Sequence, residues 1–100
     1  MILGAYFANT LGAPTPTPSA SATGVVIAVT GPSAAQVDTF RLQTNAGQAL
    51  DFRVGRLDLS NGGLPAPHVR EHLVSGIPIT VSYYVDAGTN VAVHYVDAVQ

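Results

Sequence analysis

Two short runs of alternating apolar and polar residues, joined by a turn, constrain the fold of this chain most. Phe40 and Leu42 share one face of residues 38–44 (DTFRLQT), and residues 49–54 (ALDFRV) repeat the alternation after a turn at residues 45–47. A period of two is typical of a β-strand with one buried face. Asn and Gly in the turn tolerate positive φ angles. The pattern therefore predicts a β-hairpin.

Three further apolar runs have the composition of strands. They are residues 24–30 (GVVIAVT), residues 77–85 (IPITVSYYV) and residues 91–98 (VAVHYVDA). β-branched and aromatic residues dominate these runs, and Gly, Pro, Asn or Asp residues flank them. Pro78 is tolerated near the start of a strand or at a sheet edge. The sequence thus predicts five strands in all.

Residues 67–75 (PHVREHLVS) have the pattern of a short helix. Pro67 suits the first helical turn, and Gly76 suits the residue that ends a helix. The expected apolar side of this helix consists of Val69, Leu73 and Val74.

The predicted order is three strands, a short helix and two strands. This is the element order of a mainly β, OB-type Greek-key barrel, with the helix between the third and fourth strands. The alternatives are another small barrel, or a two-sheet sandwich with the helix plugging one end. The predicted core consists of Val26, Phe40, Leu42, Leu50, Phe52, Leu73, Ile79, Val81, Tyr83, Val91 and Val93.

The chain divides into three parts by composition. Residues 1–13 are apolar and uncharged, residues 14–23 (PTPTPSASAT) are a spacer, and residues 24–100 form the predicted barrel domain. Alternating prolines favour an extended spacer, because proline fixes φ and lacks a backbone N–H donor. Ten such residues reach about 30 Å. The first thirteen residues are therefore expected to act as an extended N-terminal arm.

The arm presents an apolar surface without any charge. Its large residues are Ile2, Leu3, Tyr6, Phe7 and Leu11. Their spacing fits one stripe of a short helix, and the segment also suits addition as a strand at a sheet edge. We expect these residues to bind a neighbouring subunit or partner protein. The alternatives are the remnant of an export signal and packing against the chain's own barrel.

Composition disfavours several functions. Only 10% of the residues are charged, with four arginines, no lysine and six acidic residues. Without a positive field or a tryptophan, single-stranded nucleic acid is not the expected partner. No cysteine is present, and no nucleotide-binding glycine motif occurs. No apolar run reaches the roughly 18 residues of a membrane span, so any membrane association would be by proximity.

Residues 68–72 spell H-x-x-E-H, which is the pattern of inverted zinc peptidases. His68 and His72 share a helix face and are weak candidates for metal ligands. A catalytic site needs a third ligand, and the only other histidine is His94, while Glu71 is the only glutamate. We therefore expect a solvated outer helix face with no functional metal, no cofactor and no enzyme activity.

Residues 24–98 resemble the short OB-like domains of exported bacterial proteins. The resemblance rests on the opening GVVIAV, the FRLQT–turn–LDFRV hairpin, the segment PHVREHLVSGIPITVSYY and the closing VAVHYVDA. It implies a barrel fold and an exported chain, and it transfers no catalytic residue. The proline-rich spacer is also common in surface-tethered bacterial domains. An extracytoplasmic or cell-surface location is therefore expected.

Two classes of function remain after this reading. The first is a structural subunit of an extracytoplasmic assembly that uses residues 1–13. The second is a binding module for a small ligand, an oligosaccharide or a metal. That module would use the barrel surface around Tyr84 and His94, together with His68 and His72.

Overall fold

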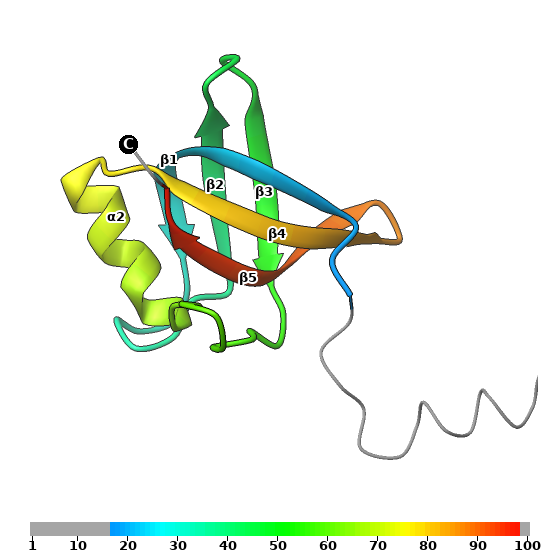
Figure 1. The fold of residues 1–100 in the computed structure, drawn as a ribbon. Coiled ribbons are helices and arrows are strands. Elements are labelled where there is room, and N and C mark those ends of the chain that lie inside the picture. Colours follow the sequence, from blue (N-terminus) through cyan, green and yellow to red (C-terminus); the bar gives the residue numbers. More distant parts are fainter. Residues whose placement is uncertain (1–16, 99–100) are drawn as a thin grey trace, which may run out of the picture.

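The protein, in a computed structural model that describes residues 17–98, forms a closed barrel of five strands (Figure 1). The strands are β1 (Ala20–Thr30), β2 (Thr39–Thr44), β3 (Ala49–Val54), β4 (Ile79–Asp86) and β5 (Thr89–Asp97). A helical segment, η1 (Ala66–His68) followed by α2 (Val69–Ser75), lies between β3 and β4, as predicted. Within residues 17–98, no helix has the length and apolar character that crossing a membrane requires.

The barrel closes in the order β1-β2-β3-β5-β4, and β4 returns to β1. All neighbours are antiparallel except β3 and β5, which run parallel. Gly24 lies where β1 passes from one neighbour to the other, because it pairs with both Thr44 and Ile79. A Cβ atom at this position would stand 2.2 Å from the backbone oxygen of Gln43. Only glycine permits so close an approach of the two strands.

The β2–β3 hairpin has the predicted register. Phe40 pairs with Phe52, and their stacked ring centroids lie 5.2 Å apart inside the barrel. Gly47 adopts the positive φ of 83° that the turn requires. The second hairpin, β4–β5, turns through Ala87 and Gly88, which have φ angles of 50° and 81°. Two positive φ angles match the right-handed twist of the flanking strands.

Most of the predicted core is confirmed. The buried members are Val26, Phe40, Leu42, Phe52, Ile79, Val81, Val91 and Val93. Leu50 and Tyr83 are half-buried and pack against this core. Leu73 does not belong to it, because 40% of its surface is exposed. The core also contains Val37, Val69, Ala92, Tyr95 and His72.

A β-bulge in β5 changes which side chains face the barrel interior. Ser82 pairs with His94, whereas the next residue of β4, Tyr83, pairs with Ala92, so Val93 is the extra residue. As a result Ala92 and Tyr95 pack in the central cluster. The common inward face of Val91, Val93 and Tyr95 that a strict period of two predicts is therefore wrong, although all three residues are buried.

The loop after β3 runs along the edge of β5. Three backbone amides of the loop donate to carbonyl oxygens of the strand, over 2.8–3.0 Å. The pairs are Gly55 with Ala92, Asp58 with Val93, and Leu64 with Tyr95. These bonds continue the backbone pairing of β5 beyond the short parallel ladder that it forms with β3.

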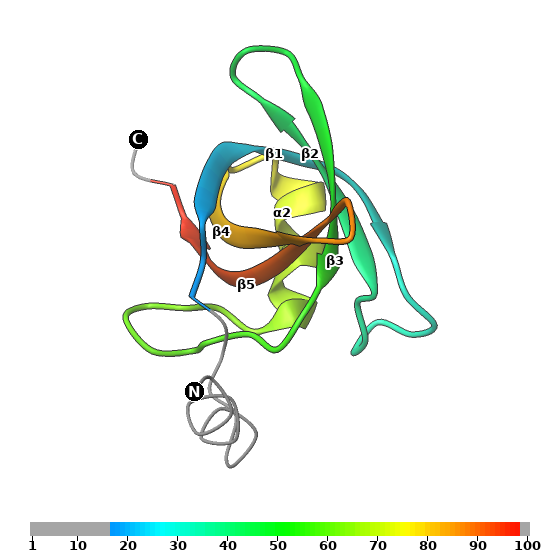
Figure 2. The same cartoon turned by 90° about the vertical axis from the view of Figure 1, so that its right-hand side faces the viewer.

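The helix α2 lies across one end of the barrel (Figure 2). Its buried side consists of Val69 and His72, and Gly76 ends it with a left-handed φ of 74°. The predicted apolar side is wrong at Leu73 and Val74, which are exposed. The helix has only seven residues, so it contacts the barrel through one narrow stripe of side chains. This stripe consists of Val69 and His72, which lie three residues apart on the same helix face.

Strands β1, β4 and β5 begin at other residues than predicted, and β5 begins at Thr89 rather than Val91. β1 begins at Ala20 rather than Gly24, so the last residues of the predicted spacer pair with β4. β4 begins at Ile79 rather than Ile77, which is exposed. Ile77 lies before β4 and Val85 lies near its end, so neither extends the inward face of Ile79 and Val81, and both are exposed.

Candidate functional site

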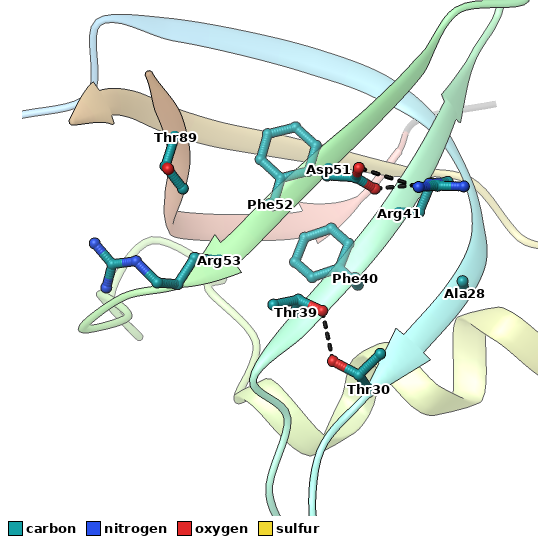
Figure 3. Close-up of a pocket in the computed structure, with 9 residues that line it drawn as sticks. All are labelled: Ala28, Thr30, Thr39, Phe40, Arg41, Asp51, Phe52, Arg53 and Thr89. Atoms are coloured by element: carbon teal, nitrogen blue, oxygen red, sulfur yellow. Dashed lines mark hydrogen bonds and ion pairs between the residues drawn. The ribbon is translucent and has the colours of Figure 1, made fainter. Parts of the chain in front are cut away.

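A hollow lies on the outer face of β1, β2 and β3 (Figure 3). It has a volume of about 530 Å³. The residues that line it are Ala28, Thr30, Thr39, Phe40, Arg41, Asp51, Phe52, Arg53 and Thr89. The β4–β5 turn contributes Thr89 and so borders the hollow at one side.

Strand alternation explains why polar side chains gather here. Phe40 points into the barrel, so its neighbours Thr39 and Arg41 point outward. Across the β2–β3 ladder, Thr39 pairs with Arg53 and Arg41 pairs with Asp51. The same alternation that builds the core thus builds a polar surface on the opposite side of the sheet.

An ion pair between β2 and β3 crosses the hollow. Arg41 Nε lies 2.7 Å from Asp51 Oδ1, and Arg41 Nη2 lies 3.1 Å from Asp51 Oδ2. This two-pronged hydrogen bond holds the pKa of Asp51 below its usual value and raises the pKa of Arg41. Both side chains remain more than half exposed. The pair therefore presents fixed donors and acceptors to solvent.

Hydroxyl groups and a second arginine complete the lining. Thr30 Oγ1 and Thr39 Oγ1 share a hydrogen bond of 2.5 Å between β1 and β2 (Figure 3). Arg53 Nη2 lies 3.8 Å from the carboxylate of Asp86, and both side chains are at least half exposed. Each arginine at the hollow is thus close to an acidic partner, so the hollow carries little net charge.

The aromatic residues at the hollow offer no ring face to a ligand. Phe40 and Phe52 are 3% and 1% exposed, as expected for core residues. Tyr84 and His94 are half-buried, and neither lines this hollow. His94 borders a smaller hollow of about 310 Å³, where its Nε2 lies 3.1 Å from the Ser60 backbone oxygen. Hydrogen bonds from Ser60 lower the pKa of the neighbouring Asp58.

The two histidines of the helical segment lie elsewhere, between the helix and the end of β5. His72 is only 3% exposed, so the expected solvated outer face is wrong for this residue. Its Nδ1 lies 2.9 Å from the Ile77 backbone oxygen, and its Nε2 lies 2.7 Å from Asp97 Oδ1. His68 is half-buried, with its Nδ1 2.8 Å from Glu71 Oε2.

Asp97 is the residue of this cluster that the sequence analysis missed. His68 Nε2 lies 4.0 Å from the same Asp97 oxygen that contacts His72. Asp97 is 25 residues from His72 along the chain (97 − 72), and only the barrel topology brings the end of β5 to the helix. The expected partner-binding residues Ile2, Leu3, Tyr6, Phe7 and Leu11 lie outside the described residues.

Comparison of the chain with protein-family models, with curated proteins and with solved structures gave no match. The resemblance to exported OB-like domains therefore stays a prediction.

Proposed function

We propose that this protein is a non-enzymatic binding module whose β1–β2–β3 outer face takes a hydroxyl-rich ligand of the oligosaccharide class. The observation that carries the proposal is the two-pronged Arg41–Asp51 pair that lines a hollow of about 530 Å³. An OB-type barrel, which the element order favours, binds oligosaccharides and oligonucleotides on this face and its neighbouring loops. Fold analogy alone assigns no function, so the chemistry of the hollow must decide between these ligands.

Sugar hydroxyls both donate and accept hydrogen bonds, and the hollow supplies both partners. The Asp51 carboxylate has about four acceptor positions, of which Arg41 uses two. Arg41 keeps unused N–H groups beyond the two that it gives to Asp51. Because the two side chains hold each other, a ligand would pay little of the usual ordering entropy on binding. Thr30, Thr39 and Thr89 add further hydroxyl partners.

The charge of the hollow disfavours a polyanion. Binding of nucleic acid draws most of its affinity from unpaired lysine and arginine at phosphates. At this face Arg41 is paired with Asp51, and Arg53 stands near Asp86. Base stacking needs exposed rings, and Phe40 is buried. These features support a neutral, hydroxylated ligand over an oligonucleotide.

The test is NMR titration of the ¹⁵N-labelled protein with cellopentaose, chitopentaose and maltopentaose, and separately with a thymidine oligonucleotide. We expect one of the oligosaccharides to shift the amides of Thr39, Arg41, Asp51 and Arg53. Asp51→Asn should abolish these shifts, whereas Asp58→Asn, a matched change at the smaller hollow, should retain them. Shifts with the oligonucleotide alone, or none with any sugar, would refute the proposal.

The assembly role of residues 1–13 is a second candidate. What favours it is an uncharged segment with five large apolar residues, joined to the barrel by a proline-rich spacer. Ser19 N donates to Tyr83 O at 2.9 Å, so the chain is already fixed to the barrel directly after Pro18. A protein partner or identical subunits in an extracytoplasmic assembly would then be bound by the arm, while the barrel face stays available for its ligand.

A further inference from the structure

A second cluster of polar side chains lies at the helix-capped end of the barrel, apart from the outer-face hollow. His68 precedes α2, His72 lies within it, and Asp97 ends β5. One ligand atom from each of the three lies within 4.8 Å of the others. We propose that these three residues bind one divalent transition-metal ion, with zinc the best fit.

The Nδ1 contacts of both imidazoles leave the Nε2 atoms available to bind a metal. The Ile77 backbone oxygen can only accept, so His72 Nδ1 carries the proton of that 2.9 Å contact. His68 Nδ1 lies 2.8 Å from Glu71 Oε2 in an ion-pair contact, and because a carboxylate can only accept, this contact favours a proton on Nδ1. In metal sites the second ring nitrogen of a histidine ligand usually donates to a carbonyl or carboxylate in this way. Both side chains are thus held in the tautomer that coordinates through Nε2.

The Nε2 atom of His72 is buried without a hydrogen-bond partner. Asp97 Oδ1 lies only 2.7 Å away, but the contact does not meet the geometry of a hydrogen bond. Two ligands of one shared ion also lie close together without a hydrogen bond between them, because each points its lone pair at the ion. A buried polar atom without a partner is costly, and coordination would satisfy it.

The spacing of the three atoms fits an ion after a small side-chain movement. Zinc takes nitrogen ligands at about 2.0–2.1 Å and carboxylate oxygens at similar lengths, so neighbouring ligands of a tetrahedral ion stand about 3.3 Å apart. The contacts from Asp97 Oδ1, 2.7 Å to His72 and 4.0 Å to His68, lie on either side of this value. The Asp97 side chain is 61% exposed and has room to rotate.

The ligand set selects the kind of metal. Two imidazoles and one carboxylate suit zinc and its neighbours in the first transition series, whereas calcium and magnesium prefer oxygen ligands alone. Three protein ligands leave the fourth position to water. Asp97 supplies the third ligand that the sequence analysis lacked when it expected no functional metal. Coordination would join the helical segment to the end of β5.

The test is zinc titration of the full chain after removal of metal with EDTA, followed by calorimetry and by ¹⁵N NMR of the imidazoles. We expect one zinc ion per chain, a shift of the Nε2 resonances of His68 and His72, and a raised thermal midpoint. Asp97→Asn and His68→Gln should each weaken binding by about tenfold or more. Both residues are partly exposed, so these variants should fold. His94→Gln is the matched control and should bind zinc as the parent does.

The proposal is overturned if the parent chain binds no zinc, or if the Nε2 resonances of His68 and His72 stay unchanged. It is also overturned if His94→Gln weakens binding as much as His68→Gln does. Retention of full affinity in Asp97→Asn would refute the three-ligand site.

Discussion

The Tyr95 hydroxyl of β5 donates a 2.5 Å hydrogen bond to the backbone oxygen of Pro65, directly before the helical segment. The His68 amide donates to the same oxygen over 3.1 Å. Tyr95 is buried, and burial, together with the negative charges of Asp97 and Glu71, raises its pKa. One residue of the last strand thus fixes where the helical segment begins.

Tyr95→Phe should lower the free energy of unfolding by about 1 kcal/mol, because it removes this hydrogen bond without changing the packed volume. Urea denaturation at neutral pH measures the loss, and Tyr84→Phe at a half-buried position is the control. In the parent, one tyrosine should stay protonated above the ordinary value of about 10. The stability that protonated Tyr95 contributes is fully present below that pH, and it is lost as the pH rises through the raised pKa of Tyr95. A phenol absorbance titration that is identical in Tyr95→Phe would contradict this assignment.

Phe52→Ala should cost about 3–5 kcal/mol, because it removes a ring that stacks on Phe40 and meets Tyr83 edge-on. Val74→Ala, at a position 89% exposed, should change stability by less than about 0.5 kcal/mol. Chemical denaturation of both variants gives the comparison. A loss below about 1 kcal/mol for Phe52→Ala would be inconsistent with a closed, packed barrel.

Arg41→Gln should return the pKa of Asp51 toward its usual value, because the side-chain hydrogen bond from Arg41 is the largest cause of the lowering. A lowered carboxyl pKa stabilises the fold above the unfolded-state pKa, and this stability is lost as the pH falls through the folded-state pKa. The parent should therefore exceed Arg41→Gln in stability at neutral pH, with the difference shrinking in acid.

Carbon-13 NMR titration of the Asp51 carboxyl measures the pKa directly. Arg53→Gln, on the neighbouring strand, serves as the control and should leave the pKa of Asp51 low. An unchanged Asp51 titration in Arg41→Gln would mean that the pair does not form in solution.

Deletion of residues 1–13 should leave the barrel folded and abolish assembly. All the strand pairings of the barrel begin at or after Ala20, so none of them is removed. Light scattering after size exclusion gives the particle mass, and circular dichroism checks the fold. If the mass of the particle is unaffected by the deletion, the arm has no role in assembly.

The sequence predicts the fold correctly where the alternation of apolar and polar residues matches the strand pairing of the barrel. Phe40 and Phe52 lie opposite each other as the hairpin pattern predicts, because a period of two leaves only one register with a buried face. The order of elements then predicts a barrel, since five apolar strands need their edges covered. The helix was also predictable from Pro67 and Gly76.

What the sequence could not supply depends on contacts between distant residues. The bulge at Val93 shifts the inward face of β5 by one residue, and no residue type marks its position. His72 looked like a surface residue because helical spacing alone does not say which stripe of a short helix meets the barrel. Asp97 joins the two histidines only after β5 returns to the helix. The alternation around Phe40 and Leu42 implies an outward polar face on the hairpin, but no sequence pattern marks the hollow on that face.

The parallel ladder between β3 and β5 has a consequence for the synthesis of the chain. β5 is the neighbour of both β3 and β4, so the barrel cannot close until the final strand has been translated. A chain that stops before Thr89 would leave β3 and β4 each with an unpaired edge, and such edges recruit other chains. Termination of synthesis before β5 is thus expected to yield aggregates rather than a smaller folded barrel.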